Sequence, residues 1–194
     1  MTYDYIRDTV LKKGYVFYTG TYDLNVIGLR NANRTADSFD DKMYVCYRDA
    51  HGNGRLFELP ITTDPGLSYL KKPINGKGCA ILMPGQYKGM WRIGMHQGRY
   101  KALVQRGPCT VVRDKNQDSI LDMNGPTETG VFGINFHYVN RQTIQESIGN
   151  GSAGCQVSPV FEDHSYVMSL VDLQVRYIHS EAVTYTLLLE SDLG

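Results

Sequence analysis

Several absences in the sequence narrow the class of protein. The chain has no net charge, because 20 Lys and Arg residues balance 20 Asp and Glu residues. Its charge therefore gives no overall attraction to nucleic acid or to anionic lipid. No apolar run approaches the ~18 residues that cross a bilayer, and residues 1–14 lack the apolar core and cleavage site of a signal peptide. We expect synthesis in the cytoplasm without a signal peptide, no membrane span and no nucleic-acid partner.

Cysteine is scarce, and its spacing excludes two common uses. None of the four cysteines forms a CxxC pair, which argues against a zinc ribbon or a thioredoxin motif. Cys46, Cys79 and Cys109 lie in apolar, strand-like segments and are expected to be small buried hydrophobic residues. Cys155 differs, because it follows the small residues of Gly151-Ser-Ala-Gly154.

The composition favours one folded, mainly β domain over residues 1–194. Apolar residues make up 42% of the chain and charged residues 21%, which is ordinary for a globular protein. Short runs rich in β-formers alternate with Gly, Pro, Asn and Asp, the pattern of a mainly β fold. Apolar periodicity predicts an N-terminal helix over Tyr3–Lys13 and one C-terminal helix over Phe161–Tyr177, with Asp163 as its N-cap.

Ten strands are expected between and after these helices, and Gln97-Gly98 is expected to form a hairpin turn. The expected strands are Tyr15–Tyr18, Leu24–Leu29, Lys42–Tyr47, Arg55–Thr62, Cys79–Met83, Trp91–Met95, Tyr100–Val104, Cys109–Arg113, Val131–Tyr138 and Val183–Leu189.

Cys155 and His137 are candidates for a nucleophile and its base. A tight glycine turn before Cys155 lets backbone N–H groups converge, as they do in an oxyanion hole. A thiol also needs a base or a depressed pKa to act as a nucleophile at neutral pH. His137 ends an apolar run eighteen residues upstream, and the polar segment between the two is long enough to bring them together. Taken alone, such a pair is weak evidence for catalysis, because a structural histidine is the commoner case.

The wider sequence resembles the L,D-transpeptidase (YkuD-type) family. His137, the eighteen-residue step and Ser152-Ala-Gly-Cys155 are similar to the family signature of a histidine, a gap and Ser/Thr-His-Gly-Cys. The resemblance covers roughly residues 22–190 and is strongest to a phage and bacterial branch. It implies an L,D-transpeptidase-like β-sandwich or barrel. The segments that carry it are Thr62–Gly66, Pro84–Tyr87, Arg92–His96, Ala102–Gln105, Arg113-Asp114, Gly130–His137 and Ser152–Val157.

The resemblance implies a role for each residue of the signature. Cys155 would attack an amide carbonyl of a peptidoglycan stem peptide, and His137 would take the thiol proton and return it to the leaving amine. The backbone carbonyl of Tyr138 would orient His137, and the N–H groups of Gly154 and Cys155 would form the oxyanion hole. The chemistry requires no cofactor.

Three departures from the usual signature concern the acceptor side of the site. Ala153 stands where the family has histidine, Tyr138 where it has glycine or serine, and Gln156 where many members are hydrophobic.

Four further residues are expected to contact substrate: His96, Trp91, Ser152 and Gln156. His96 lies beside the expected hairpin turn, on the rim of the site. Its alternative role is an exposed or hydrogen-bonded hairpin histidine. Trp91 is expected in an aromatic wall for the stem peptide, with core packing as its alternative.

An acidic segment has the oxygen-ligand spacing of a calcium loop. Asp114, Asn116, Asp118 and Asp122 fall at positions 1, 3, 5 and 9, and the carbonyl of Ile120 falls at position 7. The usual glycine at position 6 and glutamate at position 12 are missing. The segment predicts a structural calcium site, with a solvated acidic turn as the alternative.

The expected function is a peptidoglycan-active cysteine enzyme that forms an acyl-enzyme on Cys155. A lytic, phage-type peptidase is the leading interpretation, because a protein without a signal peptide reaches the wall after release, in a virion or by delivery. One alternative is an L,D-transpeptidase that makes or exchanges stem-peptide links. The other is a non-catalytic virion or wall-binding module.

Overall fold

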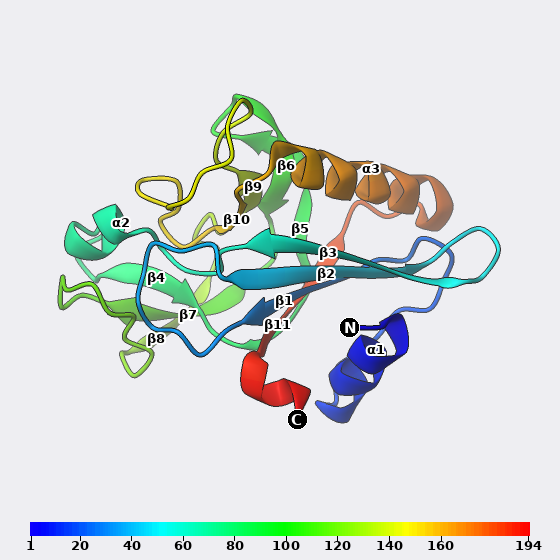
Figure 1. The fold of residues 1–194 in the computed structure, drawn as a ribbon, viewed down its shortest axis with the longest axis horizontal. Helices are drawn as coiled ribbons and strands as arrows, with labels where there is room; N and C mark the ends of the chain where they lie inside the picture. Colours follow the sequence, from blue (N-terminus) through cyan, green and yellow to red (C-terminus); the bar gives the residue numbers. More distant parts are fainter.

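The computed structural model describes residues 1–194 and shows a mainly β fold with a helix near each end (Figure 1). The helices are α1 (Tyr3–Lys12), α2 (Leu67–Lys71) and α3 (Phe161–Ile178), followed by a final 3-10 turn, η1 (Glu190–Leu193). The strands are β1 (Asn25–Arg30), β2 (Asp41–Arg48), β3 (Gly54–Ile61), β4 (Cys79–Leu82), β5 (Gly85–His96), β6 (Tyr100–Gln105), β7 (Cys109–Asp114), β8 (Thr127–Gly130), β9 (Phe136–Tyr138), β10 (Gln156–Ser158) and β11 (Val183–Leu189).

The main sheet closes on itself like a barrel. Its eight strands run in the order β10-β9-β6-β5-β11-β1-β2-β3. Directly after β3, Thr62 pairs antiparallel with Val157 of β10, and the two residues exchange backbone hydrogen bonds of 2.8 and 3.0 Å. The first and last strands of the order therefore meet. A smaller sheet, β4-β7-β8, lies beside the barrel.

Two faces of the barrel wall are buried, which explains its continuous apolar strands. In β2, Met43 and Val45 point into the main core, while the alternate residues Tyr44 and Cys46 point outward and pack beneath α1. The helix contributes an apolar stripe to this second core. The stripe consists of Tyr3, Ile6 and Val10.

Helix α3 covers the main core near β9 and β10 (Figure 1). Val167, Leu170 and Val171 are buried against the interior of the barrel, where Trp91 and Tyr185 are also fully enclosed. The N-terminal part of α3 therefore lies beside the two strands that carry the candidate catalytic residues.

The three strand cysteines are free and buried, as expected from their apolar surroundings. Cys109 lies in the main core, Cys46 beneath α1, and Cys79 in a third cluster between α2 and the small sheet. Burial raises the thiol pKa to about 12 for Cys46 and Cys79 and to about 11 for Cys109.

The expected helices and hairpin are present, with one error at a helix start. Helix α3 begins at Phe161, and its N-cap is Val160; the prediction of Asp163 as the N-cap is wrong. Asp163 lies within the first turn, where a carboxylate complements the helix dipole. Gln97 and Gly98 form the β5–β6 turn with φ angles of 50° and 70°.

Two expected strands are wrong in whole or in part. Residues 15–18 form no strand, because the backbone of Val16 bonds to the side chain of Gln86 instead of a neighbouring strand. Of Val131–Tyr138, only the last three residues are β9. The N–H groups of Phe132 and Ile134 both donate to the side-chain oxygen of Gln105, at 2.9 Å, which interrupts the strand.

Candidate active site

Cys155 and His137 are brought together by two short parallel strands. In the β9–β10 pair, His137 is opposite Val157 and Phe136 is opposite Gln156. Cys155 directly precedes β10, and the N–H of Gln156 donates to the carbonyl of Asn135 at 2.8 Å. Because side chains alternate along a strand, the side chains at positions 155 and 137 project from the same face of this pair.

A tight turn presents Cys155. The Ser152 hydroxyl donates to the Cys155 carbonyl at 2.9 Å and accepts from the N–H of Gly154 at 3.1 Å. Gly154 has a φ of +120°, and a Cβ there would lie 2.3 Å from the carbonyl oxygen of Ala80 on β4. Only glycine fits this position, both for its backbone conformation and for its close approach to the small sheet.

This turn determines which backbone N–H groups near Cys155 are available as oxyanion donors. The Gly154 N–H donates to the Ser152 hydroxyl in this structure, so its expected part in an oxyanion hole stays a prediction. The Cys155 N–H donates to no group of the chain and is the available donor.

The Cys155 thiol is partly exposed and rests between two backbone groups. Its sulfur accepts from the N–H of Asn135 at 3.4 Å, and its proton faces the carbonyl of Gly133 at 3.4 Å. Burial raises the pKa of this thiol to about 11, although the Asn135 N–H acts in the opposite direction. The resting thiol is therefore protonated, and it makes no direct hydrogen bond to His137 in this structure.

His137 is buried and oriented through Nδ1. That atom lies 3.0 Å from the carbonyl oxygen of Tyr138, so the expected orienting contact is present. The Tyr100 hydroxyl donates to the same carbonyl at 3.0 Å. A carbonyl only accepts, so Nδ1 carries the proton and the Nε2 lone pair is free to accept one. Burial, and then the neighbouring His96, lower the pKa of His137 to about 3.

His96 lies beneath the site rather than on its rim. It is 7% exposed, and its ring stacks on His137 with centroids 4.0 Å apart and planes at 21°. The expectation of a rim residue is therefore wrong, because the β5–β6 hairpin folds this side chain inward. His164 of α3 joins the same aromatic cluster through Tyr138 and Phe136, and burial lowers its pKa to about 4.

Three other residues expected to contact substrate are enclosed by the fold. Trp91 is fully buried, and its indole N–H donates to the carbonyl of Ile134 at 2.8 Å. Ser152 is 1% exposed and holds the turn, while Gln156 is fully buried and accepts from the Tyr185 hydroxyl at 2.6 Å. Trp91 packs in the main core, as its alternative role requires, and substrate contact by these three residues stays a prediction. Ser152 and Gln156 hold the backbone on either side of Cys155.

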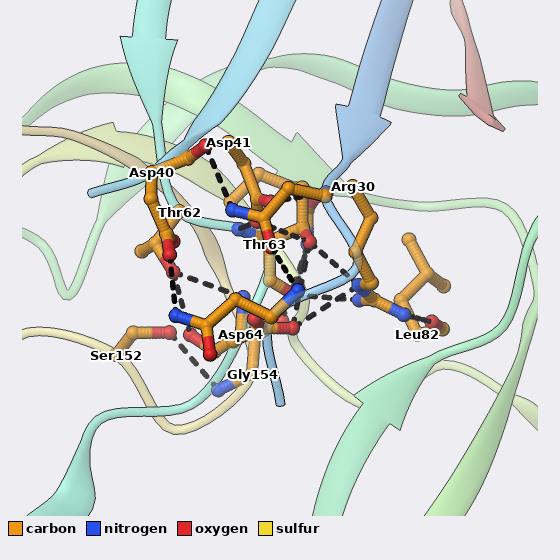
Figure 2. Close-up of polar contacts among 12 residues, drawn as sticks. Arg30, Asp40, Asp41, Thr62, Thr63, Asp64, Leu82, Ser152 and Gly154 are labelled. Carbon is orange, nitrogen blue, oxygen red and sulfur yellow. Dashed lines mark hydrogen bonds and ion pairs between the residues drawn. The ribbon is translucent and has the colours of Figure 1, made fainter. Parts of the chain in front are cut away.

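A buried polar network lies next to the same turn (Figure 2). Arg30 forms an ion pair of 3.1 Å with Asp64 and donates to the Thr63 carbonyl at 2.9 Å. The Thr63 hydroxyl donates to Asp41 at 2.7 Å, and the Gln156 amide lies within 3.5 Å of both the Thr63 and the Gly154 carbonyls. The network thus connects β1 and β2 to the residues on either side of Cys155.

The network holds two carboxylates against one guanidinium. Burial raises the pKa of Asp64 to about 6 even though Arg30 lies against it, and burial also raises the pKa of Asp41. Both carboxylates belong to residues less than 10% exposed.

A pocket of about 340 Å³ opens beside the turn that precedes Cys155. Ala153 forms part of its wall, together with Phe132 and the edge of β4 at Cys79. Arg113 also lines it, with its guanidinium 5.0 Å from the Phe132 ring and paired to Glu128 at 2.8 Å. The position where the family signature has histidine therefore borders an open hollow lined by both apolar and polar groups.

The acidic loop belongs to the small sheet and not to this site. The Asn116 amide lies between the carboxylates of Asp118 and Asp122, at 2.9 and 2.8 Å, and the Asp122 N–H donates to Asp114 at 2.9 Å. The side chain of Ile120 is exposed, and its N–H donates to Asp118 at 2.7 Å. No group of three or more His, Cys, Asp or Glu side chains is arranged to hold a metal ion. The calcium site stays a prediction.

Sequence reasoning missed three residues that shape the site. Asn135 contacts the Cys155 sulfur through its backbone and His96 through its side chain, and Tyr100 contacts the carbonyl that orients His137. Thr63 connects Arg30 to Asp41. Asn135 lies two residues before His137, a spacing that places both on one face of a strand.

No family model, curated protein or solved structure matches the chain. The resemblance to L,D-transpeptidases therefore stays a prediction that rests on the residues themselves. No helix of the protein has the length and apolar character needed to cross a membrane.

Proposed function

We propose that the protein is a cysteine enzyme that forms an acyl-enzyme on Cys155 with the stem peptides of peptidoglycan. The observation that carries the proposal is that Cys155, directly before β10, and His137, on β9, lie on the same face of one pair of strands. Cys155 projects from a glycine turn, and His137 is held by the Tyr138 carbonyl with Nε2 unprotonated. A thiol and a neutral imidazole are the two groups that nucleophilic catalysis of this type requires.

The proposed reaction begins with transfer of the thiol proton to Nε2 of His137. The sulfur attacks the amide carbonyl, and the Cys155 N–H donates to the oxyanion that develops. The C–N bond then breaks, and His137 returns the proton to the leaving amine. Water attacks the thioester in the second half-reaction, which releases the acid and regenerates the thiol.

The pocket beside Ala153 supports a peptide substrate. The apolar side chains in its lining suit the aliphatic part of a stem-peptide side chain, polar groups such as Arg113 also line it, and it opens within two residues of Cys155. The replacement of the signature histidine by alanine widens this side of the site.

Hydrolysis is the proposed outcome, with action on the wall after release in phage lysis, in a virion or by delivery. An amine in place of water would make the protein a transpeptidase. The raised thiol pKa and the lack of a Cys155–His137 hydrogen bond favour a second candidate, a binding module without turnover.

The test is mass spectrometry of purified peptidoglycan after incubation with the wild type, Cys155→Ala and Cys46→Ala. The proposal expects smaller stem peptides or lost cross-links with the wild type and with Cys46→Ala, whose substitution lies beneath α1 away from the site. Cys155→Ala should be inactive with an unchanged circular dichroism spectrum.

Other outcomes discriminate the alternatives. New cross-links, or incorporation of an added D-amino acid, would show that the protein is a transpeptidase and not a hydrolase. An unchanged wall that nevertheless binds the protein would establish the binding module. Activity retained in Cys155→Ala would overturn the acyl-enzyme.

A further inference from the structure

The orientation of the Asn135 side chain is fixed by a backbone group. Its Oδ1 lies 2.8 Å from the N–H of Gln105, and that group can only donate. The amide oxygen must therefore face Gln105, which directs the NH2 group to Nδ1 of His96, 3.1 Å away.

This contact fixes the protonation of His96. An NH2 group only donates, so Nδ1 of His96 accepts and carries no proton. The neutral ring has its proton on Nε2. An imidazolium at His96 would place an N–H against the Asn135 NH2, two donors with no acceptor between them.

His96 also lies flat against His137, at a centroid separation of 4.0 Å. When His137 accepts the thiol proton it becomes a cation. A neutral aromatic ring stacked on a cation attracts it, whereas a second cation would repel it. The charge of His96 therefore decides how readily His137 takes the proton.

We propose that His96 is a positioning residue for His137. Asn135 keeps His96 neutral, so that its stacked ring stabilises the imidazolium that His137 becomes when it accepts the proton of Cys155. This role rests on the proposed function of Cys155 and His137. It gives His96 and Asn135 a role in proton transfer, and it makes Asn135 a link between the two imidazoles and Cys155.

The other groups around the stack are consistent with a neutral His96. Burial and then the charge of Arg99 lower its pKa. The titratable side chains facing the two rings from the packed elements are Tyr100 of β6, Tyr138 of β9, His164 of α3 and Cys155. None of them is a carboxylate that would favour an imidazolium.

The decisive variant is Asn135→Asp, which keeps the shape and replaces the NH2 donor by an acceptor. The new carboxylate can accept from Nδ1–H of His96, so it should raise the pKa of His96 by about one to three units. The readout is the long-range ¹⁵N–¹H spectrum of the imidazoles, which reports the protonation of each nitrogen without any substrate. His164→Phe is the matched control, because His164 belongs to the same cluster without contacting Asn135.

The proposal expects His96 with its proton on Nε2 in the wild type and in His164→Phe, and a doubly protonated His96 near neutral pH in Asn135→Asp. If turnover is present, the acid limb of kcat/KM should move to higher pH in Asn135→Asp, and by less in His164→Phe, because His164 is a minor cause of the lowered pKa of His137. A wild-type His96 protonated at Nδ1 would overturn the proposal.

His96→Phe keeps a stacked ring and removes the titrating nitrogens, which gives a second measurement if Asn135→Asp fails to fold. It should retain the His137 tautomer and a His137 pKa close to that of the wild type, because a neutral ring still stacks on His137. A His137 pKa that rises strongly in His96→Phe would show that His96 is charged in the wild type and would also overturn the proposal. The spectra are independent of peptidoglycan, so inactivity of the wild type would count against the proposed function and not against this inference.

Discussion

The Tyr185 hydroxyl donates a 2.6 Å hydrogen bond to the side-chain oxygen of Gln156, the residue after Cys155. Both side chains are fully buried, and the bond runs across the interior of the barrel from β11 to β10. A polar side chain at this position anchors the strand that follows the nucleophile, and it does so from inside the core.

Gln156→Leu should destabilise the fold by about 1–3 kcal/mol, because it leaves the Tyr185 hydroxyl buried without a partner. Urea unfolding measures the loss. Gln156→Leu combined with Tyr185→Phe should recover part of it, since neither polar group then remains. If the double variant loses the sum of the stability losses of the two single variants, the two side chains are not coupled.

Gly154→Ala should disturb the nucleophile turn more than any other single methyl group added to the site. The new Cβ meets the Ala80 carbonyl at 2.3 Å, and the φ of +120° is itself strained for alanine by about 1–3 kcal/mol. Gly76→Ala is the control, because nothing lies within 4 Å of its Cβ position. Thermal unfolding and alkylation of Cys155 should change only in the first variant.

Arg30→Met should cost more stability at high pH than at low pH. Removing a buried partner typically costs about 3–5 kcal/mol, and here Asp64 and Asp41 lose their cation. The pKa of Asp64 is already raised to about 6, and loss of Arg30 raises it further. A raised carboxyl pKa destabilises the folded state as pH rises through it, so the deficit should be large at pH 8 and smaller at pH 5.

Urea unfolding at both pH values tests this prediction. Lys101→Met is the control, because its ion pair with Asp172 is solvent-exposed and screened. An equal deficit for Arg30→Met at pH 5 and pH 8 would show that the carboxylates are not responsible.

Alkylation of Cys155 by iodoacetamide should accelerate with rising pH. Burial raises the thiol pKa to about 11, so the thiolate fraction, and with it the rate, increases throughout the range from pH 7 to 10. Intact-protein mass spectrometry should show one modified thiol, because the other three are buried. A rate that is already maximal below pH 7 would instead indicate a thiolate–imidazolium pair with His137.

Calcium should raise the melting temperature if the acidic loop binds it. The Asn116 amide donates to the carboxylates of both Asp118 and Asp122. A bound cation would take the place of this amide between the two carboxylates. At a hundred times Kd the stabilisation amounts to about 2.7 kcal/mol. Scanning calorimetry in calcium and in EDTA measures it, with Asp118→Asn as the variant that should lose it. If the wild type melts at the same temperature in calcium and in EDTA, the segment is a solvated acidic turn and not a calcium site.

The sequence predicted most of the barrel strands and both long helices because their signals are local. In β2, the apolar run from Met43 to Tyr47 indicates a strand whichever core each residue enters. Strand β10 was not predicted, because it has only three residues. In addition, Gln156 and Ser158 are polar residues of the kind expected at the surface, although the fold buries them. Their burial depends on Tyr185 and on other partners distant in the chain.

The candidate site was predictable to the same extent. Cys155, His137 and the Tyr138 carbonyl were expected from the resemblance to a family signature, and the contact of His137 with the Tyr138 carbonyl is local in the sequence. The roles of Asn135 and His96 depend on which backbone groups of β6 and β9 lie beside them, such as the N–H of Gln105. Arg30, Asp41 and Asp64 are charged residues that propensity places at the surface; their pairing exists only in the folded barrel.

The pairing of Thr62 with Val157 has a consequence for the order of folding. Strands β9 and β10 have three residues each, so they are too short to form a stable pair alone and depend on segments around residues 62, 103 and 137 being in place. Contacts between such distant segments form late, after local hairpins such as β2–β3. The thiol and the imidazole thus become neighbours only when the barrel closes, so a growing or partly folded chain would hold an unassembled, inert site.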